Sequence, residues 1–234
     1  MPFQNELLLI GSLLFHFSAV LVAWRLFGKA GLYAMTVFST VAANIEVMIL
    51  VSAFGMEQTL GNVLFAASFL ITDILSENEG KKAADRAVNL GIFTSLIFVL
   101  TTQSWLLFIP AEGDTVMEGV RRVFANTPRT ILSSMLVYAV TQRFDVWLYH
   151  KWWEYTEKKY GDSHRFLWLR NNGSTLVSQM LNTVLFTLCA FWGAYPTSTL
   201  LSIMGSSYLI FIVTSLCDTP VVYIARWMKK KYQL

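Results

Sequence analysis

Apolar residues occur along this chain in long runs that short polar segments separate. A helix needs about 20 mostly apolar residues to cross a membrane, and several runs approach or exceed that length. The third run is the shortest and the last is the longest. The pattern predicts an all-α, polytopic membrane helical bundle with spans at residues 7–27, 31–54, 59–76, 87–109, 127–149, 171–193 and 199–227.

The composition supports a membrane location. Only 14% of the 234 residues are charged, whereas 55% are hydrophobic. Soluble domains carry about 25% charged residues, so this chain has too little charge to cover a water-facing surface. A lipid bilayer is the solvent that such a chain requires. The net charge is only +3, and the basic residues gather near the ends of apolar runs, so we expect no nucleic-acid partner.

The loops between the predicted spans alternate in their content of Lys and Arg. Fifteen of the 18 basic residues fall on alternate loops and on the C-terminal tail, and the fourth loop alone breaks the pattern. Cytoplasmic loops collect Lys and Arg. We therefore expect a protein of the cytoplasmic (inner) membrane, with its N-terminus outside and its C-terminus in the cytoplasm. The aromatic segment 150–168 is expected to be a loop along the cytoplasmic surface.

Acidic residues inside the predicted spans are the most informative polar groups. Glu46, Asp73, Asp145 and Asp218 all lie within apolar runs. A charged side chain at the bilayer centre costs about 2.5–3.5 kcal/mol on insertion scales, so these side chains must face one another, water or a ligand. Three of them lie near the inner ends of their spans, where this cost is lower. A purely structural role therefore remains an alternative for each.

Asp73 and Glu77 are four residues apart, so they project from one face of a helix. Their carboxylates could accept hydrogen bonds from a donor-rich ligand, such as a guanine-like edge. They could equally pair with Lys81 or Lys82 in the loop that follows. The spacing alone leaves both interpretations open.

The sixth predicted span carries a stripe of amides and hydroxyls. Its members are Asn171, Thr175, Ser178 and Asn182, with Gln179 and Thr183 beside them. Amides supply both donors and acceptors, as the edge of a planar heterocycle does. The alternative is that these groups bridge neighbouring helices, as Ser, Thr, Asn and Gln often do in membranes.

Two further positions attract attention. Pro220 lacks a backbone N–H and is expected to kink the last span, which frees a carbonyl close to Asp218. Arg129 begins the fifth span, where it could steer a ligand or extend its charge to the interface. The sequence contains no Walker A, HExxH or GxSxG motif and no Cys/His couple. We therefore predict that the protein is not an enzyme and has no cofactor or metal site.

Four segments resemble the queuosine precursor transporter family, also called the vitamin uptake transporter family. They are "ASFLITDILSENEGKKAADRAVNLGIFTS", "FDVWLYHKWWE", "LWLRNNGSTLVSQMLNTVLFT" and "CDTPVVYIARW". The resemblance extends from about Gly31 to Trp227. It implies uptake of a 7-deazaguanine, namely preQ0, preQ1 or queuine, for the modification of transfer RNA.

The resemblance also implies a fold related to the substrate-binding subunits of energy-coupling-factor transporters. Six spans are usual in the family, so residues 1–30 would hold an additional N-terminal helix and residues 31–234 a six-helix transport core with a cytoplasmic tail. No energising ATPase partner is expected, and nothing indicates an oligomeric state. The alternative is a ligand-binding subunit of an energy-coupling-factor importer for a vitamin-like small molecule.

The resemblance implies a flat, guanine-like ligand. We expect its polar contacts to be Asp73, Glu77, Gln179 and Asn182, together with Asp218, Arg129 and Asn172. Tyr208, Phe211 or Phe69 could stack on the ring, an effect worth about 1–3 kcal/mol per base. The last span of the family often carries a Lys seven residues before its Asp-Thr-Pro, and Phe211 occupies that position here.

Overall fold

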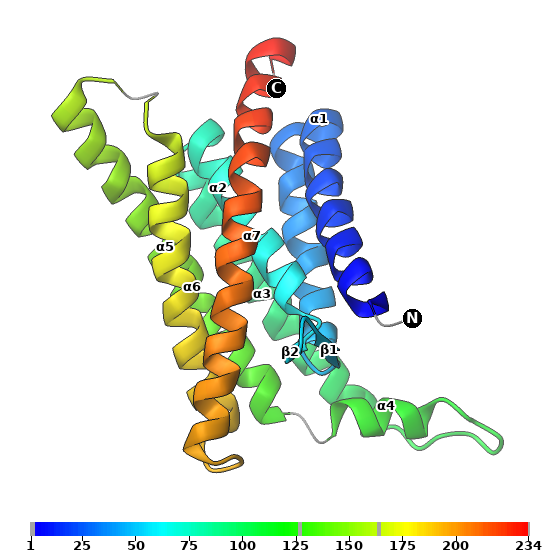
Figure 1. Ribbon diagram of the computed structural model, residues 1–234. Helices are drawn as coiled ribbons and strands as arrows, with labels where there is room; N and C mark the ends of the chain where they lie inside the picture. Colours follow the sequence, from blue (N-terminus) through cyan, green and yellow to red (C-terminus); the bar gives the residue numbers. More distant parts are fainter. Residues whose placement is uncertain (1–2, 126–127, 163–164, 234) are drawn as a thin grey trace.

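The computed structural model describes residues 3–125, 128–162 and 165–233. Within these ranges the chain forms seven helices and one β-hairpin (Figure 1). The elements in chain order are α1 (Gln4–Glu46), β1 (Leu50–Ala53), β2 (Met56–Thr59), α2 (Asn62–Glu79), α3 (Lys81–Trp105), α4 (Met117–Phe124), α5 (Pro128–Tyr160), α6 (Leu167–Phe191) and α7 (Thr197–Tyr232).

The first helix consists of two segments that meet at Gly28. This residue has φ 56° and ψ −141°, a conformation that glycine adopts without steric cost. A Cβ at Gly31 would lie 2.2 Å from the carbonyl oxygen of Ala23, although eight residues of straight helix span about 12 Å. The chain therefore turns back on itself, and Figure 1 shows the two blue segments side by side. The break expected between residues 27 and 31 is present.

The predicted helix over 31–54 was wrong in its last part. The helix ends at Glu46, and Leu50–Ala53 pairs antiparallel with Met56–Thr59. Phe54 and Gly55 form the turn, with φ of 53° and 71°, as two-residue hairpin turns require. A count of apolar residues does not distinguish a short strand from a helix.

The start of α1 anchors the hairpin. Asn5 donates a hydrogen bond from Nδ2 to the Ser52 carbonyl over 2.8 Å, and the Phe54 N–H donates to Glu6 Oε1 over 2.9 Å. The hairpin therefore marks one end of the bundle, which is called the hairpin end below. The opposite end, where α2, α5 and α7 finish and α6 begins, is called the basic end because Lys229, Lys230 and Lys231 lie there.

Four helices in the described ranges are long and apolar enough to cross a membrane, namely α1, α3, α6 and α7. The spans predicted at 59–76 and 127–149 correspond to α2 and α5, which are more polar; residue 127 lies outside the described residues. In α2, every residue from Ala66 to Ser76 is buried. A helix that other helices surround needs no lipid-facing surface, so α2 lies at the centre of the bundle.

Several helices are longer than predicted. The segment expected as a surface loop after residue 149 continues α5 as far as Tyr160, and α3 begins at Lys81 rather than at 87. The last helix continues through Pro220 to Tyr232. The short helix α4 was not predicted. The structure shows seven helices in the described ranges, so the division into a six-helix core and one additional N-terminal helix is not confirmed and stays a prediction.

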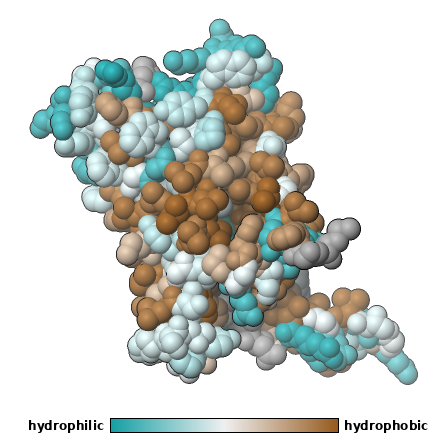
Figure 2. All heavy atoms as spheres, in the orientation of Figure 1, coloured by the Kyte–Doolittle hydropathy of each residue, from teal (hydrophilic) through white to brown (hydrophobic). Residues whose placement is uncertain are grey.

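The outer surface of the bundle is apolar. Figure 2 shows a hydrophobic band across the visible face, with hydrophilic residues gathered at the two ends. Large apolar side chains that are more than half exposed include Leu14, Phe27, Phe93, Leu136 and Leu209. In a membrane these side chains would contact lipid, which agrees with the composition.

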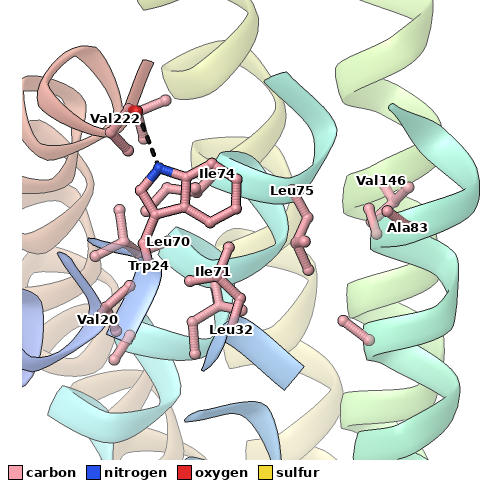
Figure 3. Close-up of a cluster of buried hydrophobic side chains, with 14 of the residues drawn as sticks. Val20, Trp24, Leu32, Leu70, Ile71, Ile74, Leu75, Ala83, Val146 and Val222 are labelled. Carbon is pink, nitrogen blue, oxygen red and sulfur yellow. Dashed lines mark hydrogen bonds between the residues drawn. The ribbon is translucent and has the colours of Figure 1, made fainter. Parts of the chain in front are cut away.

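The interior near the basic end is packed with apolar side chains (Figure 3). Val20 and Trp24 from the first segment of α1 are fully buried there against α2 and α7. The indole N–H of Trp24 donates to the Ala225 carbonyl over 3.0 Å. The first helix is therefore built into the bundle. A domain boundary at residue 30 stays a prediction, and residues 1, 2 and 234 at the outer limits of the two predicted domains lie outside the described residues.

Candidate functional site

Polar side chains gather inside the bundle where α2, α5, α6 and α7 pack together. The group called the polar core consists of Asp73, Asp145, Asn171, Ser174, Thr175, Ser178 and Asp218. Each of these residues is at most 2% exposed. The helical repeat correctly predicted that the amides and hydroxyls of α6 lie on one face of that helix. Tertiary packing then brings the four helices together.

The carboxylates of the polar core differ in their hydrogen bonding. Thr175 Oγ1 donates to Asp73 Oδ2 over 3.1 Å, and Asn171 Nδ2 donates to Asp218 Oδ1 over 2.7 Å. Both oxygens of Asp145 lack a hydrogen bond of normal geometry, although Ser174 and Ser178 lie beside them. The second oxygen of Asp73 is also unpartnered. Buried polar groups are normally satisfied, so these atoms are candidates for binding a ligand.

The three carboxylates also act on one another. Asp145 and Asp218 both repel a charge on Asp73, and Asp145 repels a charge on Asp218. They come from three different helices, which means that only the folded bundle assembles them. Burial disfavours an isolated charge, and neighbouring like charges add to that cost.

A second group lies one helical turn toward the basic end. It consists of Glu77, Tyr149, Arg170 and Arg226 and is called the ionic cluster. Arg170 donates to the Glu77 carboxylate from Nε over 2.9 Å and from Nη2 over 2.6 Å. The Tyr149 hydroxyl donates to Glu77 over 2.8 Å, and Arg226 Nη1 lies 3.2 Å from it. The cluster joins α2, α5, α6 and α7.

The ionic cluster decides what Glu77 does in this structure. The Arg170 side chain is fully buried and its guanidinium also lies 4.2 Å from the ring centroid of Trp153. Neither of the pairings considered from the sequence, with Lys81 or Lys82, is formed by Glu77. A role of Glu77 in ligand binding stays a prediction, and here its oxygens are occupied by protein donors.

A cavity of about 440 Å³ lies at the hairpin end. Its lining includes Met56, Thr59, Asn182, Phe186, Ser207 and Phe211. The hairpin, the last turns of α6 and the first turns of α7 therefore form its walls. Pockets for small ligands have volumes of about 300–1,000 Å³, so the cavity is large enough for a planar base.

The cavity and the polar core lie on the same faces of two helices. Asn182 lines the cavity from α6, and Thr175 in the polar core is seven residues away. Phe211 lines the cavity from α7, and Asp218 is again seven residues away. Seven residues are two helical turns, or about 10 Å. The polar core therefore lies about 10 Å beyond the cavity, toward the basic end.

Aromatic rings lie between the two regions. The ring centroids of Phe65 and Phe211 are 6.0 Å apart, and those of Phe65 and Phe69 are 5.3 Å apart. Phe69 and Phe211 are buried. A smaller cavity of about 40 Å³ extends the space past Asn182 and Phe211 to Phe65 and Ser134. Aromatic side chains therefore separate the larger cavity from the carboxylates.

Gln179 lies on α6 between Asn182, which lines the cavity, and Thr175, which belongs to the polar core. It is fully buried, and neither its amide oxygen nor its amide nitrogen has a hydrogen-bond partner. It stands three residues from Asn182 and four from Thr175, so all three share one side of the helix. The structure thus brings together four of the expected contacts, Asp73, Gln179, Asn182 and Asp218, along one path.

Other expected contacts have structural partners. Arg129 donates to the carbonyl oxygens of Cys189 and Trp192 over 2.8 and 2.7 Å, which satisfies carbonyls at the end of α6. Asn172 donates to Thr219 Oγ1 over 2.7 Å and so joins α6 to α7, as the alternative interpretation of these amides required.

Tyr208 is not among the aromatic residues that pack together near the cavity, which are Phe65, Phe69 and Phe211. It is half-buried, and its neighbour Ser207 lines the cavity. Sequence reasoning singled out Asp145 as an acid in a span but did not include it among the site residues. It also missed Arg170 as the partner of Glu77. The signal for Arg170 was a basic residue at the start of an amide-rich apolar run.

Comparison with known proteins agrees with this architecture. Residues 59–225 match the family model described as "Putative vitamin uptake transporter". This range includes the polar core and the helices that line the cavity. The chain belongs to the vitamin uptake transporter family.

A named relative agrees with this membership. The chain is 40% identical over 213 residues to a Bacillus subtilis (strain 168) protein named "Probable queuosine precursor transporter", and the match covers 91% of each chain. The resemblance found in the sequence is therefore confirmed. No solved structure matches the chain, so the expected relation to energy-coupling-factor subunits stays a prediction.

Proposed function

We propose that this protein imports a queuosine precursor, a 7-deazaguanine base such as preQ0, preQ1 or queuine, across the cytoplasmic membrane. Family membership and the name of the relative from Bacillus subtilis support a transporter for this class of molecule. The observation that carries the proposal is the cavity of about 440 Å³, which shares the faces of α6 and α7 with buried, unpartnered polar groups on the far side of an aromatic separation. Ionisable groups inside the membrane region of a protein typically belong to a substrate or ion pathway.

The base first occupies the cavity at the hairpin end. Phe186 and Phe211 offer aromatic faces there, and the Asn182 amide supplies a donor and an acceptor. The guanine-like edge of the base combines N–H donors with a carbonyl acceptor, and amides match both. Deeper in the bundle, Gln179 and Asp73 present the unpartnered amide and carboxylate atoms that the base meets as it moves inward.

The two ends of the bundle suit alternating access. The hairpin end contains the cavity, whereas the ionic cluster ties α2, α5, α6 and α7 together near the basic end. In the proposed orientation the hairpin end faces outside and the basic end faces the cytoplasm, in agreement with the distribution of Lys and Arg. The structure then corresponds to an outward-facing state, and import requires the ionic cluster to open.

A cellular experiment tests the proposal. The chain is expressed alone in a bacterial host that neither synthesises nor imports queuosine precursors, and queuosine in transfer RNA is measured after preQ0, preQ1 or queuine is supplied. We expect restored queuosine without any added ATPase components. No queuosine with any of the three bases would refute the proposal, and restoration only with an added energising complex would favour the binding-subunit alternative.

Binding is tested on purified protein. A ligand that binds only the folded state raises the apparent melting temperature by mass action, so the bound base should do so and adenine should not. Phe211→Ala should weaken binding about tenfold, because stacking of a base on an aromatic side chain is worth about 1–3 kcal/mol. Leu209→Ala is the matched control, since Leu209 lies on the same helix and is 51% exposed.

A further inference from the structure

The polar core and the ionic cluster together contain more acid than base. The ionisable members of these two groups are Asp73 and Glu77 on α2, Asp145 and Tyr149 on α5, Arg170 on α6, and Asp218 and Arg226 on α7. If every carboxylate were ionised, four negative charges would face two guanidinium groups. Both guanidinium groups pair with Glu77. The two groups together would then carry a net excess of two negative charges, and the three aspartates Asp73, Asp145 and Asp218 would all lie outside these ion pairs.

Such an excess of charge is not stable inside a membrane protein. An uncompensated ion in the bilayer interior costs several kcal/mol, and buried carboxylates normally become neutral instead. The excess must therefore be offset by bound positive charge. A proton, a metal cation or a cationic group of the transported base could supply that charge.

The geometry favours the proton. Among the described residues, no three His, Cys, Asp or Glu side chains are placed to hold one metal ion. Thr175 donates to Asp73 and Asn171 donates to Asp218, so two of the carboxylates that repel one another each have a separate hydrogen-bond donor of the protein. The cavity that could admit an organic cation is about 10 Å away along α6 and α7. A proton needs neither a shared coordination shell nor a cavity.

Asp145 has the surroundings that a reversible proton carrier needs. It is fully buried, both of its oxygens lack hydrogen bonds of normal geometry, and Ser174 and Ser178 lie beside it. The Ser178 hydroxyl is itself buried and unpartnered. A hydroxyl donates to an ionised carboxylate and accepts from a protonated one, so rotation of Ser178 accommodates either state without moving a helix.

We propose that Asp145, together with Asp218 and Asp73, forms a proton-binding site that couples import of the base to the entry of protons. This proposal rests on the proposed transport function. Asp145 takes up a proton in the outward-facing state and releases it toward the cytoplasm after the ionic cluster opens. Neutralisation of the polar core removes the repulsion that a fully ionised core would exert, and the loaded carrier then changes conformation.

The experiment separates transport from coupling. The full-length protein is reconstituted into proteoliposomes and supplied with the radiolabelled base that the cellular test identifies. Exchange of labelled for unlabelled base is measured at equal pH on both sides. Accumulation is measured in two separate arms. One has an alkaline interior and identical sodium concentrations inside and outside, and the other has equal pH on both sides and an inward sodium gradient.

Protons should drive accumulation by the wild-type protein. We expect exchange at equal pH, and at least fivefold accumulation above the external concentration only with the alkaline interior. Exchange without pH-driven accumulation would overturn the proton proposal while leaving the transport function intact. Accumulation driven by a sodium gradient instead would also overturn it. Absence of exchange would refute the transport function itself and, with it, the coupling.

Two variants locate the site. Asp145→Asn mimics a permanently protonated carboxyl group, so it should still exchange the base at a measurable rate but should lose pH-driven accumulation. Asp218→Asn should reduce accumulation in the same direction and serves if the first variant is poorly folded. Full pH-driven accumulation by both variants would overturn the assignment to these residues. Glu154→Gln is the matched control, because Glu154 lies on the same helix but is exposed and pairs with Lys151.

Discussion

Asp73 and Glu77 lie one turn apart on the same helix, yet they have opposite environments. Glu77 accepts hydrogen bonds from Arg170 and Tyr149 and pairs with Arg226. Asp73 accepts one bond from Thr175 and has one unpartnered oxygen. A buried carboxylate whose bonds are all made within the protein holds the fold, whereas one with free bonding capacity can bind something else. Glu77 in the ionic cluster differs in this way from Asp73 and Asp145 in the polar core.

The comparison predicts the largest effect for Arg170→Met. Removal of one partner from a buried ion pair typically costs about 3–5 kcal/mol. Without Arg170, the buried Glu77 carboxylate would lose its fully buried guanidinium partner and keep only Arg226 and Tyr149. We therefore expect a loss of that size in the free energy of unfolding. Chemical denaturation of the detergent-purified protein measures it.

The double variant Glu77→Gln with Arg170→Met is the control for this prediction. Replacement of both members of a buried pair is often close to neutral, so the double variant should recover much of the lost stability. If the double variant is less stable than Arg170→Met alone, the pair does not act as a unit. Glu77 would then not belong among the residues that stabilise the fold.

The sequence predicted which helical face carries Asp73 and Glu77, but it did not predict the partner of Glu77. The spacing of Asp73 and Glu77 placed them correctly on one face, because the helical repeat is a local property. The partner of Glu77 is 93 residues away along the chain, and no local pattern identifies it. Nearby Lys81 and Lys82 appeared equally suitable. Long-range pairing is decided by how helices pack, which a single sequence does not state.

The same limit explains the errors in the fold. The apolar runs located the helices, because lipid-facing and buried surfaces both demand apolar residues. The run at 31–54 also contained a hairpin, and only the turn at Phe54 and Gly55 distinguishes it from helix. The cavity was not predictable for a related reason. It lies between the hairpin, α6 and α7, which meet only in the folded chain.

A smaller effect is expected for Tyr149→Phe. The change removes one donor to Glu77 but leaves both guanidinium partners in place. Hydrogen bonds to charged groups contribute about 1.5–3 kcal/mol, and the remaining donors should keep the loss near the lower value. The free energy of unfolding measures this loss, with Tyr138→Phe as a matched control, since the buried Tyr138 hydroxyl lies near Thr40 but makes no hydrogen bond of normal geometry. Equal losses in both variants would show that the ionic cluster does not depend on this bond.

The smallest effect on stability is expected for Asp73→Asn, which should nevertheless have a large effect on transport. An asparagine oxygen can still accept the bond from Thr175, and the neutral amide removes a charge that Asp145 and Asp218 repel. The free energy of unfolding should therefore change by less than about 1 kcal/mol. Uptake of the labelled base should fall at least tenfold, because the amide replaces one carboxylate acceptor with a donor.

Parallel measurements of the free energy of unfolding and of uptake test this prediction for Asp73→Asn. A variant that loses several kcal/mol of stability would place Asp73 with Glu77 among the residues that hold the fold, and a stable variant with normal uptake would remove Asp73 from the transport path.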